Sequence, residues 1–112
     1  MYKDTNCGEP RDTSVGEQIT VAGWVNRRRD HGNLIFIDLR DRSGLLQIVF
    51  NPEYGETAHD LAQSLRSEWV VQVTGKVVAR LPGAENPELP TGAVELSVTD
   101  LVILNRSITP PF

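Results

Sequence analysis

The chain contains little cysteine, few aromatic residues and no long apolar run. Its single cysteine, Cys7, has no partner among the 112 residues, which excludes an internal disulfide and favours a cytoplasmic compartment. No segment approaches the roughly 20 consecutive apolar residues that a membrane-spanning helix requires. The N-terminus also lacks the basic and apolar pattern of a secretion signal. We therefore expect a soluble, cytoplasmic protein with no membrane partner.

Motifs of catalytic and metal sites are absent as well. The sequence has no glycine-rich phosphate loop, no nucleophile elbow and no Cys or His pair at metal-ligand spacing. Its two histidines are interpreted as a turn residue, His31, and a solvent-facing helix residue, His59. Asp38 and Asp41 lie beside arginines on one predicted strand, which favours salt bridges over a catalytic carboxylate pair. We expect no catalytic residue, no metal site and no bound cofactor in this chain.

Charge is distributed unevenly along the sequence. The formal net charge is -4, which argues against indiscriminate coating of nucleic acid. Residues 24–42 nevertheless hold five of the eleven basic side chains and only three acids, so this segment carries +2 and the remainder -6. A local basic patch on an acidic body suits a specific contact with an anionic partner.

The basic segment has the pattern of a β-hairpin. Two runs with strand character, Ile19 to Arg29 and Leu34 to Asp41, flank the polar turn 30–33 (DHGN), in which Gly and Asn can supply positive φ. Apolar residues alternate in the second run, so Phe36 is predicted on the polar face of its strand. Gly23 in the first run predicts a bulge or a sharp bend.

Three more strands are predicted beyond the hairpin. Leu45 to Phe50 and Val70 to Arg80 show the same alternation, and a fifth strand starts near Ala93. A change of parity at Leu101 predicts a bulge in that last strand. The proline- and glycine-rich segment 81–92 is predicted to be a long loop.

Three strands, one helix and two strands in this order are typical of a five-stranded Greek-key barrel of the oligonucleotide-binding (OB) type, an all-β fold. The short α-helix is predicted between strands three and four, where apolar residues of segment 58–65, including Leu61, recur at helical spacing. We expect residues 1–16 to form an N-terminal arm and residues 17–105 the barrel domain. Residues 106–112, with two adjacent prolines, are expected to begin a linker to a further domain.

The predicted ligand surface lies on strands two and three, where barrels of this type usually bind. Phe36 would project there among the arginines of segment 27–29, and an exposed ring beside arginines is what base stacking on single-stranded nucleic acid requires. Glu95 is either an exposed acid or an acceptor for the donor groups of guanine or cytosine. Trp24 and Trp69 are interpreted as core or rim packing.

One long motif identifies a resemblance. Residues 23–52, GWVNRRRDHGNLIFIDLRDRSGLLQIVFNP, closely resemble the N-terminal anticodon-binding domain of bacterial-type aspartyl-tRNA synthetases. Support comes from Cys7-Gly8, the segment 73–80 (VTGKVVAR), Gly92 to Glu95 and the closing TPPF at 109–112, so the resemblance covers essentially the whole chain. Such domains bind tRNA and perform no catalysis themselves.

The resemblance implies specific roles in reading the anticodon GUC. Phe36 would stack on the central uracil, Gln47 and Arg29 would bond to anticodon bases, and Glu95 would read the first-position guanine. Arg80 would contact the anticodon stem-loop through phosphate. His31 and Gly83 resemble the members of relaxed specificity, which accept the asparagine tRNA, with anticodon GUU, as well as the aspartate tRNA.

The same resemblance implies a longer parent enzyme. A whole aspartate-tRNA ligase would continue after Phe112 into a class II catalytic domain that uses ATP and magnesium, and it would be a homodimer. The 112 residues alone are expected to be monomeric and inactive in aminoacylation.

Three alternatives remain open at the level of sequence. The barrel could be a stand-alone binder of single-stranded nucleic acid without anticodon preference, or a protein-interaction barrel in which Phe36 anchors a peptide. It could also belong to the related asparaginyl or lysyl branch, although segments 27–32 (RRRDHG) and 34–42 (LIFIDLRDR) fit that branch less well.

Overall fold

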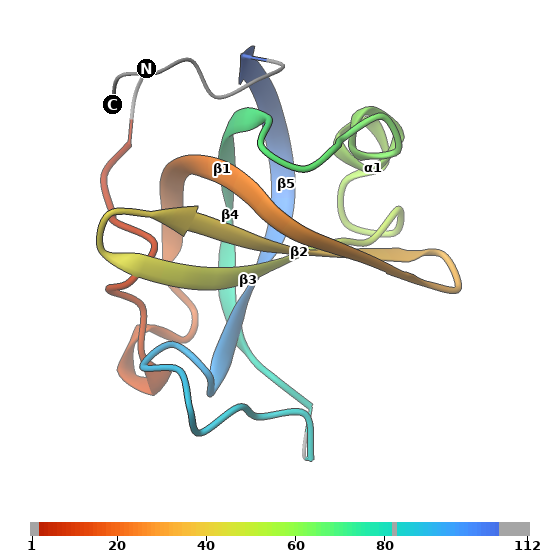
Figure 1. Cartoon of the computed structure of the whole chain (residues 1–112). Coiled ribbons are helices and arrows are strands. Elements are labelled where there is room, and N and C mark those ends of the chain that lie inside the picture. The colour runs from red at the N-terminus through yellow and green to blue at the C-terminus, as the bar shows by residue number, and fades with distance from the viewer. Residues whose placement is uncertain (1–2, 82, 106–112) are drawn as a thin grey trace.

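Five strands close into a barrel in the computed structural model, which describes residues 3–81 and 83–105 (Figure 1). The strands are β1 (Gln18–His31), β2 (Leu34–Asp41), β3 (Gly44–Phe50), β4 (Val70–Ala79) and β5 (Val94–Asn105). A 3-10 turn (Asp12–Ser14) precedes β1, and the helix α1 (Glu56–Ala62) lies between β3 and β4. The predicted all-β OB barrel with one short helix between strands three and four is therefore confirmed. The predicted linker, 106–112, lies outside the described residues.

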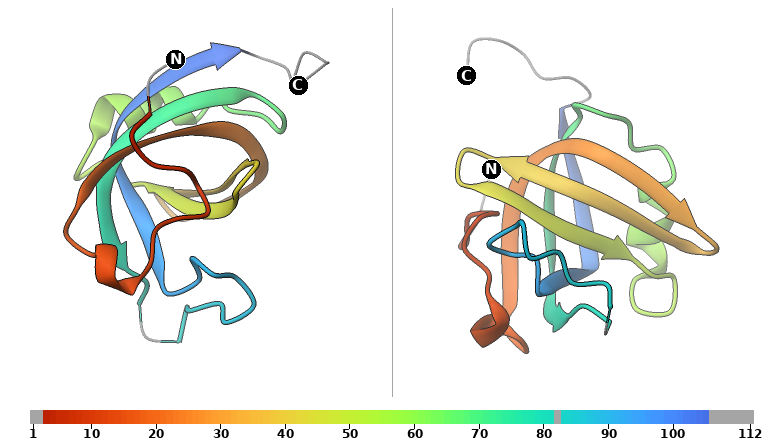
Figure 2. Two further views of the ribbon diagram at one scale, coloured as in Figure 1. Left: turned by 90° about the vertical axis from the view of Figure 1, so that its left-hand side faces the viewer. Right: turned by 60° about the horizontal axis from the view of Figure 1, so that its bottom comes forward.

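The strand order around the barrel is β1-β2-β3-β5-β4, with β4 pairing back to β1. All pairs are antiparallel except β3 with β5, which run parallel. The long strand β1 pairs with β4 through its first half and with β2 through its second half, so it bends from one side of the barrel to the other (Figure 2). The far end of the β1–β2 hairpin projects beyond the barrel, on the side where α1 lies (Figure 1).

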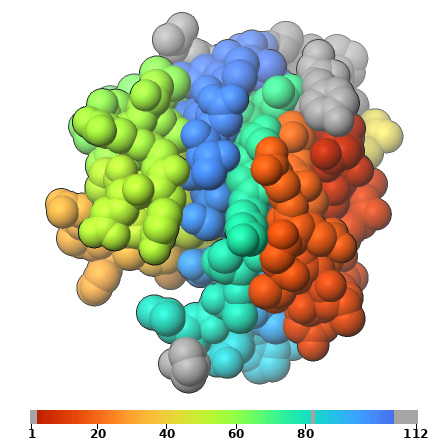
Figure 3. All heavy atoms as spheres, turned by 180° about the vertical axis from the view of Figure 1, so that it is seen from behind, coloured from red at the N-terminus to blue at the C-terminus, as the bar shows by residue number. Residues whose placement is uncertain are grey.

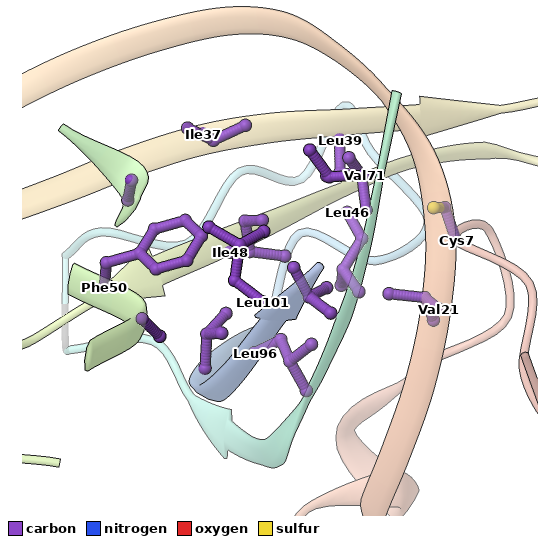
Figure 4. Packing of buried hydrophobic residues seen from close by; sticks show 14 of the residues in the cluster. Cys7, Val21, Ile37, Leu39, Leu46, Ile48, Phe50, Val71, Leu96 and Leu101 are labelled. Atoms are coloured by element: carbon purple, nitrogen blue, oxygen red, sulfur yellow. The ribbon is translucent and has the colours of Figure 1, made fainter. Parts of the chain in front are cut away.

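Inward-facing side chains from every strand form one apolar core (Figure 4). Phe50, the largest fully buried side chain, lies towards one end of the barrel, and Cys7 of the N-terminal arm contributes at the other. The helix α1 rests beside β5 (Figure 3) and buries the small residues Ala58 and Ala62. Leu61 was expected on this buried face, but it is 42% exposed because only the alanine side of the helix meets the barrel. No helix in the described ranges is long and apolar enough to span a membrane.

The N-terminal arm is anchored to the barrel by polar contacts. The backbone N–H of Cys7 donates to Oδ2 of Asp41 at 2.8 Å, and the N–H of Gly8 donates to Oγ of Ser43 at 2.7 Å. Partial burial alone would raise the pKa of Asp41. The hydrogen bonds from Ser43 and Cys7 have the opposite effect and outweigh burial, so the pKa lies below its ordinary value. The predicted salt bridges were wrong for Asp41, whose oxygens accept these hydrogen bonds instead.

The hairpin turn is tighter than predicted. β1 continues through His31, which pairs with Leu34, and leaves a two-residue turn in which Gly32 has φ 62° and Asn33 has no positive φ. For Gly23, which predicted a bulge or a sharp bend, the bulge was wrong, while β1 does change its partner from β4 to β2 at the next residue, Trp24. A Cβ at Gly23 would collide with the carbonyl oxygen of Arg40 on β2, so glycine is required there for close approach of two strands.

The real bulge in β1 lies at Asn26, between the pairs formed by Val25 and Arg27. In β5, the bulge predicted from the change of parity is confirmed. Val98 pairs with Gly75 and Asp100 pairs with Thr74 on β4, so Thr99 between them has no pairing partner in the ladder. β4 ends at Ala79, one residue earlier than expected.

Candidate nucleic-acid interface

A broad groove of about 1320 Å³ crosses the outer face of the barrel. Its walls come from the second half of β1, from β2 and β3 with the turn that follows β3, and from the neighbouring parts of β4 and β5. The loop after β4 adds residues 81, 84, 86 and 89. This is the surface predicted for ligand binding from strands two and three. The closed barrel adds β4 and β5 to it, because both strands lie next to β3 and β1 in the strand order.

Cross-strand pairing arranges the groove residues in rows. The first, here called the Glu95 row, runs across five strands through Arg27, Asp38, Gln47, Glu95 and Val78. The second, the Phe36 row, runs through Arg29, Phe36, Val49, Ser97 and Lys76. The third, the Leu34 row, contains His31 and Leu34 and continues to Asn51 and Thr99 at the same end of the groove.

The bulge at Asn26 decides which arginines belong to the groove. Before the bulge, Val25 faces the core, so an uninterrupted strand would point Arg27 and Arg29 inward as well. The extra residue reverses the parity, which places Arg27 and Arg29 in the groove and turns Arg28 to the other face. Three consecutive arginines therefore have two different surroundings.

Three of the predicted site residues form one hydrogen-bonded chain, and a fourth, Phe36, lies beside it. Nη2 of Arg29 donates to Oε1 of Gln47 at 2.9 Å, and Nε2 of Gln47 donates to Oε1 of Glu95 at 2.8 Å. The guanidinium of Arg29 also lies 5.8 Å from the centre of the Phe36 ring, within range of a cation–π contact. Oδ1 of Asp38 lies 3.9 Å from Nη2 of Arg29, so this aspartate does form a salt bridge, with an arginine of β1 rather than with the arginines near it on its own strand.

Arg80 lies at the margin of the groove and is 8% exposed. Its Nε donates to the carbonyl oxygen of Val94 at 3.0 Å. Burial lowers the pKa of this guanidinium, and the charges of Glu95 and Asp38 oppose that shift. Arg80 thus supplies a fixed positive charge beside Glu95, with little of its own surface open to a ligand.

Arg28, on the opposite face, joins the hairpin to α1. Its Nη1 donates to three backbone carbonyls at the end of the helix, those of Ala62, Gln63 and Leu65, at 2.9–3.2 Å. Such carbonyls have no partner within a helix, and a cation is favourable there. Asp30 holds the same guanidinium at 2.8 Å.

A second contact joins the helix to the hairpin turn. Nε2 of His59 lies 2.7 Å from the carbonyl oxygen of Asn33, so this partly exposed helix residue also contacts the hairpin. Together with Arg28, it fixes the hairpin that carries Arg29 into the groove.

The last two predicted site residues lie at the periphery. His31 is exposed at the end of β1 and lines the groove, as expected for a turn-proximal side chain. Gly83 is exposed in the loop after β4 with φ 88°, and the groove-lining residues of the described chain include its neighbours Leu81 and Ala84 but not Gly83 itself. Among the described residues, no group of His, Cys, Asp or Glu side chains gathers that could hold a metal ion.

Several groove residues were missed from the sequence. Lys76 and Val78 alternate with the buried residues of β4, as the period of the strand predicts, but only barrel closure shows that their face continues the groove. Tyr54 also lines the groove, from the turn between β3 and α1. Turn segments have no periodicity, so the only available signal was an aromatic residue in an otherwise polar stretch.

The barrel and its groove define a nucleic-acid-binding class of domain, and sequence comparison agrees. A family model described as an OB-fold nucleic acid binding domain matches residues 19–104. The chain therefore belongs to the OB-fold nucleic acid binding domain family. This match covers β2, β3, α1 and β4 in full, and all of β1 and β5 except one terminal residue of each.

Individual relatives confirm the resemblance seen in residues 23–52. The chain is 58% identical over 106 residues to aspartate–tRNA(Asp/Asn) ligase of Protochlamydia amoebophila, covering 95% of this chain and 18% of that protein. It is 50% identical over 110 residues to aspartate–tRNA ligase of Staphylococcus aureus strain Newman, covering 98% and 19%. The chain thus spans less than a fifth of the curated relatives it matches.

A solved structure is similar over nearly the whole barrel. The crystal structure of asparaginyl-tRNA synthetase from Pyrococcus horikoshii, complexed with asparaginyl-adenylate, superposes with a TM-score of 0.78 at 28% identity. The similarity covers 94% of this chain and 23% of that one. The OB barrel is therefore one part of a much larger chain in that synthetase.

Proposed function

We propose that this chain is the anticodon-binding domain of an aspartate-tRNA ligase and that its groove binds the anticodon GUC, with tolerance for GUU. The chain of hydrogen bonds from Arg29 through Gln47 to Glu95, beside the ring of Phe36, is the observation that carries the proposal. It combines a stacking surface with donors and acceptors in fixed order across three strands. The relatives named as ligases for the aspartate and asparagine tRNAs point to the same partner.

The geometry suits unpaired bases better than a duplex. Single-stranded loops are recognised by stacking on aromatic rings or arginine planes and by hydrogen bonds to exposed base edges. Phe36 is half-buried and keeps one part of its ring open to the groove. We propose that the central uracil stacks there and that its edge reaches Gln47 and Arg29.

Glu95 would accept hydrogen bonds from the first-position guanine. The edge of guanine that pairs in a duplex presents two donors, and a carboxylate is an acceptor with two oxygens. One oxygen of Glu95 accepts from Gln47 in the free protein, and no hydrogen bond to the other is found among the described residues. That oxygen is available to a base without any loss of the internal chain.

Activity of the whole enzyme is part of the same proposal. We propose that a longer protein uses this domain for tRNA selection, while a separate catalytic domain with ATP and magnesium activates aspartate in the cytoplasm of the cell. The parent enzyme would be a homodimer, as the family resemblance implies. This chain would then contribute recognition alone and require no cofactor.

The proposal is tested by direct binding of RNA hairpins that present GUC or a scrambled loop. The wild-type chain should prefer GUC, and Phe36→Ala should weaken GUC binding by about 1–3 kcal/mol, the usual range for base stacking. Val102→Ala is a matched control, because Val102 is 46% exposed and is not a groove-lining residue. Equal binding of both hairpins would show a general single-strand binder, and no binding of either would favour the protein-interaction barrel.

A further inference from the structure

Tyr54 has no role in the proposed recognition, yet it is unusual among the aromatic residues. Of the five aromatic residues that the structure describes, Phe50 is buried and Trp24, Phe36 and Trp69 are partly buried. Tyr54 is 65% exposed and lines the groove. A large apolar ring left open to water beside a ligand groove is a stacking surface in proteins that bind single strands.

The backbone beneath Tyr54 is fixed. The N–H groups of Tyr54 and Gly55 both donate to the carbonyl oxygen of Asn51 at 3.0 Å, and Oδ1 of Asn51 accepts from the N–H of Glu53 at 2.9 Å. Gly55 lies so close to β5 that a Cβ on it would meet the carbonyl oxygen of Val98 at 2.9 Å. The ring is thus held on a rigid turn, while its hydroxyl makes no hydrogen bond within the described ranges. Little ordering is needed before a base can stack on it.

Tyr54 belongs to the end of the groove that Phe36 does not serve. It follows Asn51 in the turn that continues the Leu34 row, whereas Phe36 lies in the next row. Adjacent rows are two residues apart along a strand, or ~7 Å, which is about twice the ~3.4 Å spacing of stacked bases. Successive bases lying across the rows must therefore be unstacked, and each needs its own surface.

We infer that Tyr54 is a second stacking platform, which holds the third base of the anticodon over the Leu34 row. The inference rests on the proposed function, in which Glu95 reads the first base and Phe36 holds the second. The order of the rows then leads from Glu95 through Phe36 to Leu34 and Tyr54. Leu34 supplies apolar surface on the same row, and it is partly open.

Stacking on Tyr54 would contribute affinity without selecting between cytosine and uracil. Stacking is tolerant of base identity, because every base has a π face. The platform would therefore hold cytosine and uracil about equally and contribute affinity for both GUC and GUU. Discrimination between the two would be left to polar groups at the same end of the groove.

The experiment is a double-mutant cycle between protein and RNA, with the full chain and synthetic hairpins. Tyr54→Ala should weaken binding of the GUC and GUU hairpins by about tenfold or more each, and Tyr54→Phe should bind like wild type. On a GUC hairpin whose third anticodon base is replaced by an abasic sugar, Tyr54→Ala and wild type should bind equally. Val102→Ala serves as the control on a surface away from the groove, and unfolding temperatures of all variants verify the fold.

Two outcomes would overturn the inference. One is an unchanged affinity of Tyr54→Ala for the intact hairpins. The other is an equal loss on intact and abasic hairpins, which would assign Tyr54 to a different nucleotide. The proposed function fails separately, when Phe36→Ala binds GUC as tightly as wild type does. A loss with Phe36→Ala but none with Tyr54→Ala would therefore reject the second platform and leave the anticodon site intact.

Discussion

Gln47 donates its side-chain amide to Glu95 at 2.8 Å, although the two residues are 48 positions apart in sequence. They meet because β3 and β5 run parallel and pair side by side across the barrel. Since Oε1 of Gln47 already accepts from Arg29, the orientation of this amide is determined by both neighbours. The carboxylate of Glu95 is thereby held as an acceptor at one end of the chain. Preorganisation of this kind lets a base be selected by its donors.

The first prediction concerns that carboxylate. Glu95→Ala should weaken binding of a GUC hairpin far more than binding of an AUC hairpin, because adenine lacks the two adjacent donors of guanine. A hydrogen bond to a charged partner contributes about 1.5–3 kcal/mol, and this is the expected difference between the two losses. Titration of both hairpins with both proteins measures it. Glu17→Ala is the matched control, since Glu17 is an exposed glutamate that does not line the groove. Equal losses for GUC and AUC would assign Glu95 a structural role.

A second prediction concerns Arg28, whose neighbour Arg27 provides the control. Arg28→Ala removes the hydrogen bonds to the carbonyls at the end of α1 and should lower the free energy of unfolding by about 1–3 kcal/mol. Arg27→Ala, at an exposed groove position, should change it by less than about 0.5 kcal/mol. Urea denaturation followed by tryptophan fluorescence gives both values. Similar unfolding energies for the two variants would show that the contact between hairpin and helix contributes nothing.

Alternation of apolar residues was sufficient to predict the strands, because period two is a local property of each segment. The order of elements then indicated the OB barrel, and the outward direction of Phe36 and Gln47 followed from parity. The site residues of β2 and β3 could be predicted from the sequence for the same reason. On β4 and β5, Glu95 was assigned to the site only by the family resemblance, and Lys76, Val78 and Ser97 were not assigned to it, since strand pairing across the barrel depends on contacts far apart in sequence.

The bulge at Asn26 shows why the three arginines could not be separated. A shift of parity can be read from hydrophobicity only where apolar residues continue beyond the bulge, and every residue of segment 26–31 is polar. Gly23 was a better candidate by residue type, but its smallness serves close strand contact instead. The prediction that Leu61 is buried was wrong for a different reason. Helical spacing shows that residues share a face, and it does not show how much of that face a seven-residue helix can bury.

The third prediction uses the acidic anchor of the N-terminal arm. Because the pKa of Asp41 is lowered in the folded state, its ionised form stabilises the fold above the ordinary pKa near about 4, and this stabilisation is lost as the pH falls through the folded value. Asp41→Asn should therefore be less stable than wild type at pH 7, and the gap should narrow below about pH 4. Thermal unfolding across pH 2.5–7 gives the comparison. Asp12→Asn, at an exposed position of the arm, is the control. A gap that stays constant with pH would show that ionisation of Asp41 is irrelevant.

The last prediction concerns the third anticodon base, which is cytosine in GUC and uracil in GUU. His31 lies at the end of β1 on the Leu34 row, where the proposed reading order brings this base. An imidazole can donate and accept hydrogen bonds, so it can serve the amino group of cytosine or the carbonyl group of uracil. The wild-type chain should bind the two hairpins within roughly tenfold, or about 1.4 kcal/mol.

Substitution of His31 should change that ratio without changing the fold. His31→Leu removes the adaptable partner, so the remaining fixed groups decide between the bases, and the preference for GUC should sharpen. His31→Gln keeps one donor and one acceptor at a similar place and should retain the tolerance for GUU. The measurement is the affinity of each hairpin for the wild-type chain and the two variants. Because His31 is exposed, the unfolding temperatures of all three proteins should be similar, which verifies that the fold is unchanged. A wild-type chain that already rejects GUU by a hundredfold, or a ratio that is the same in His31→Leu, would contradict the role of His31.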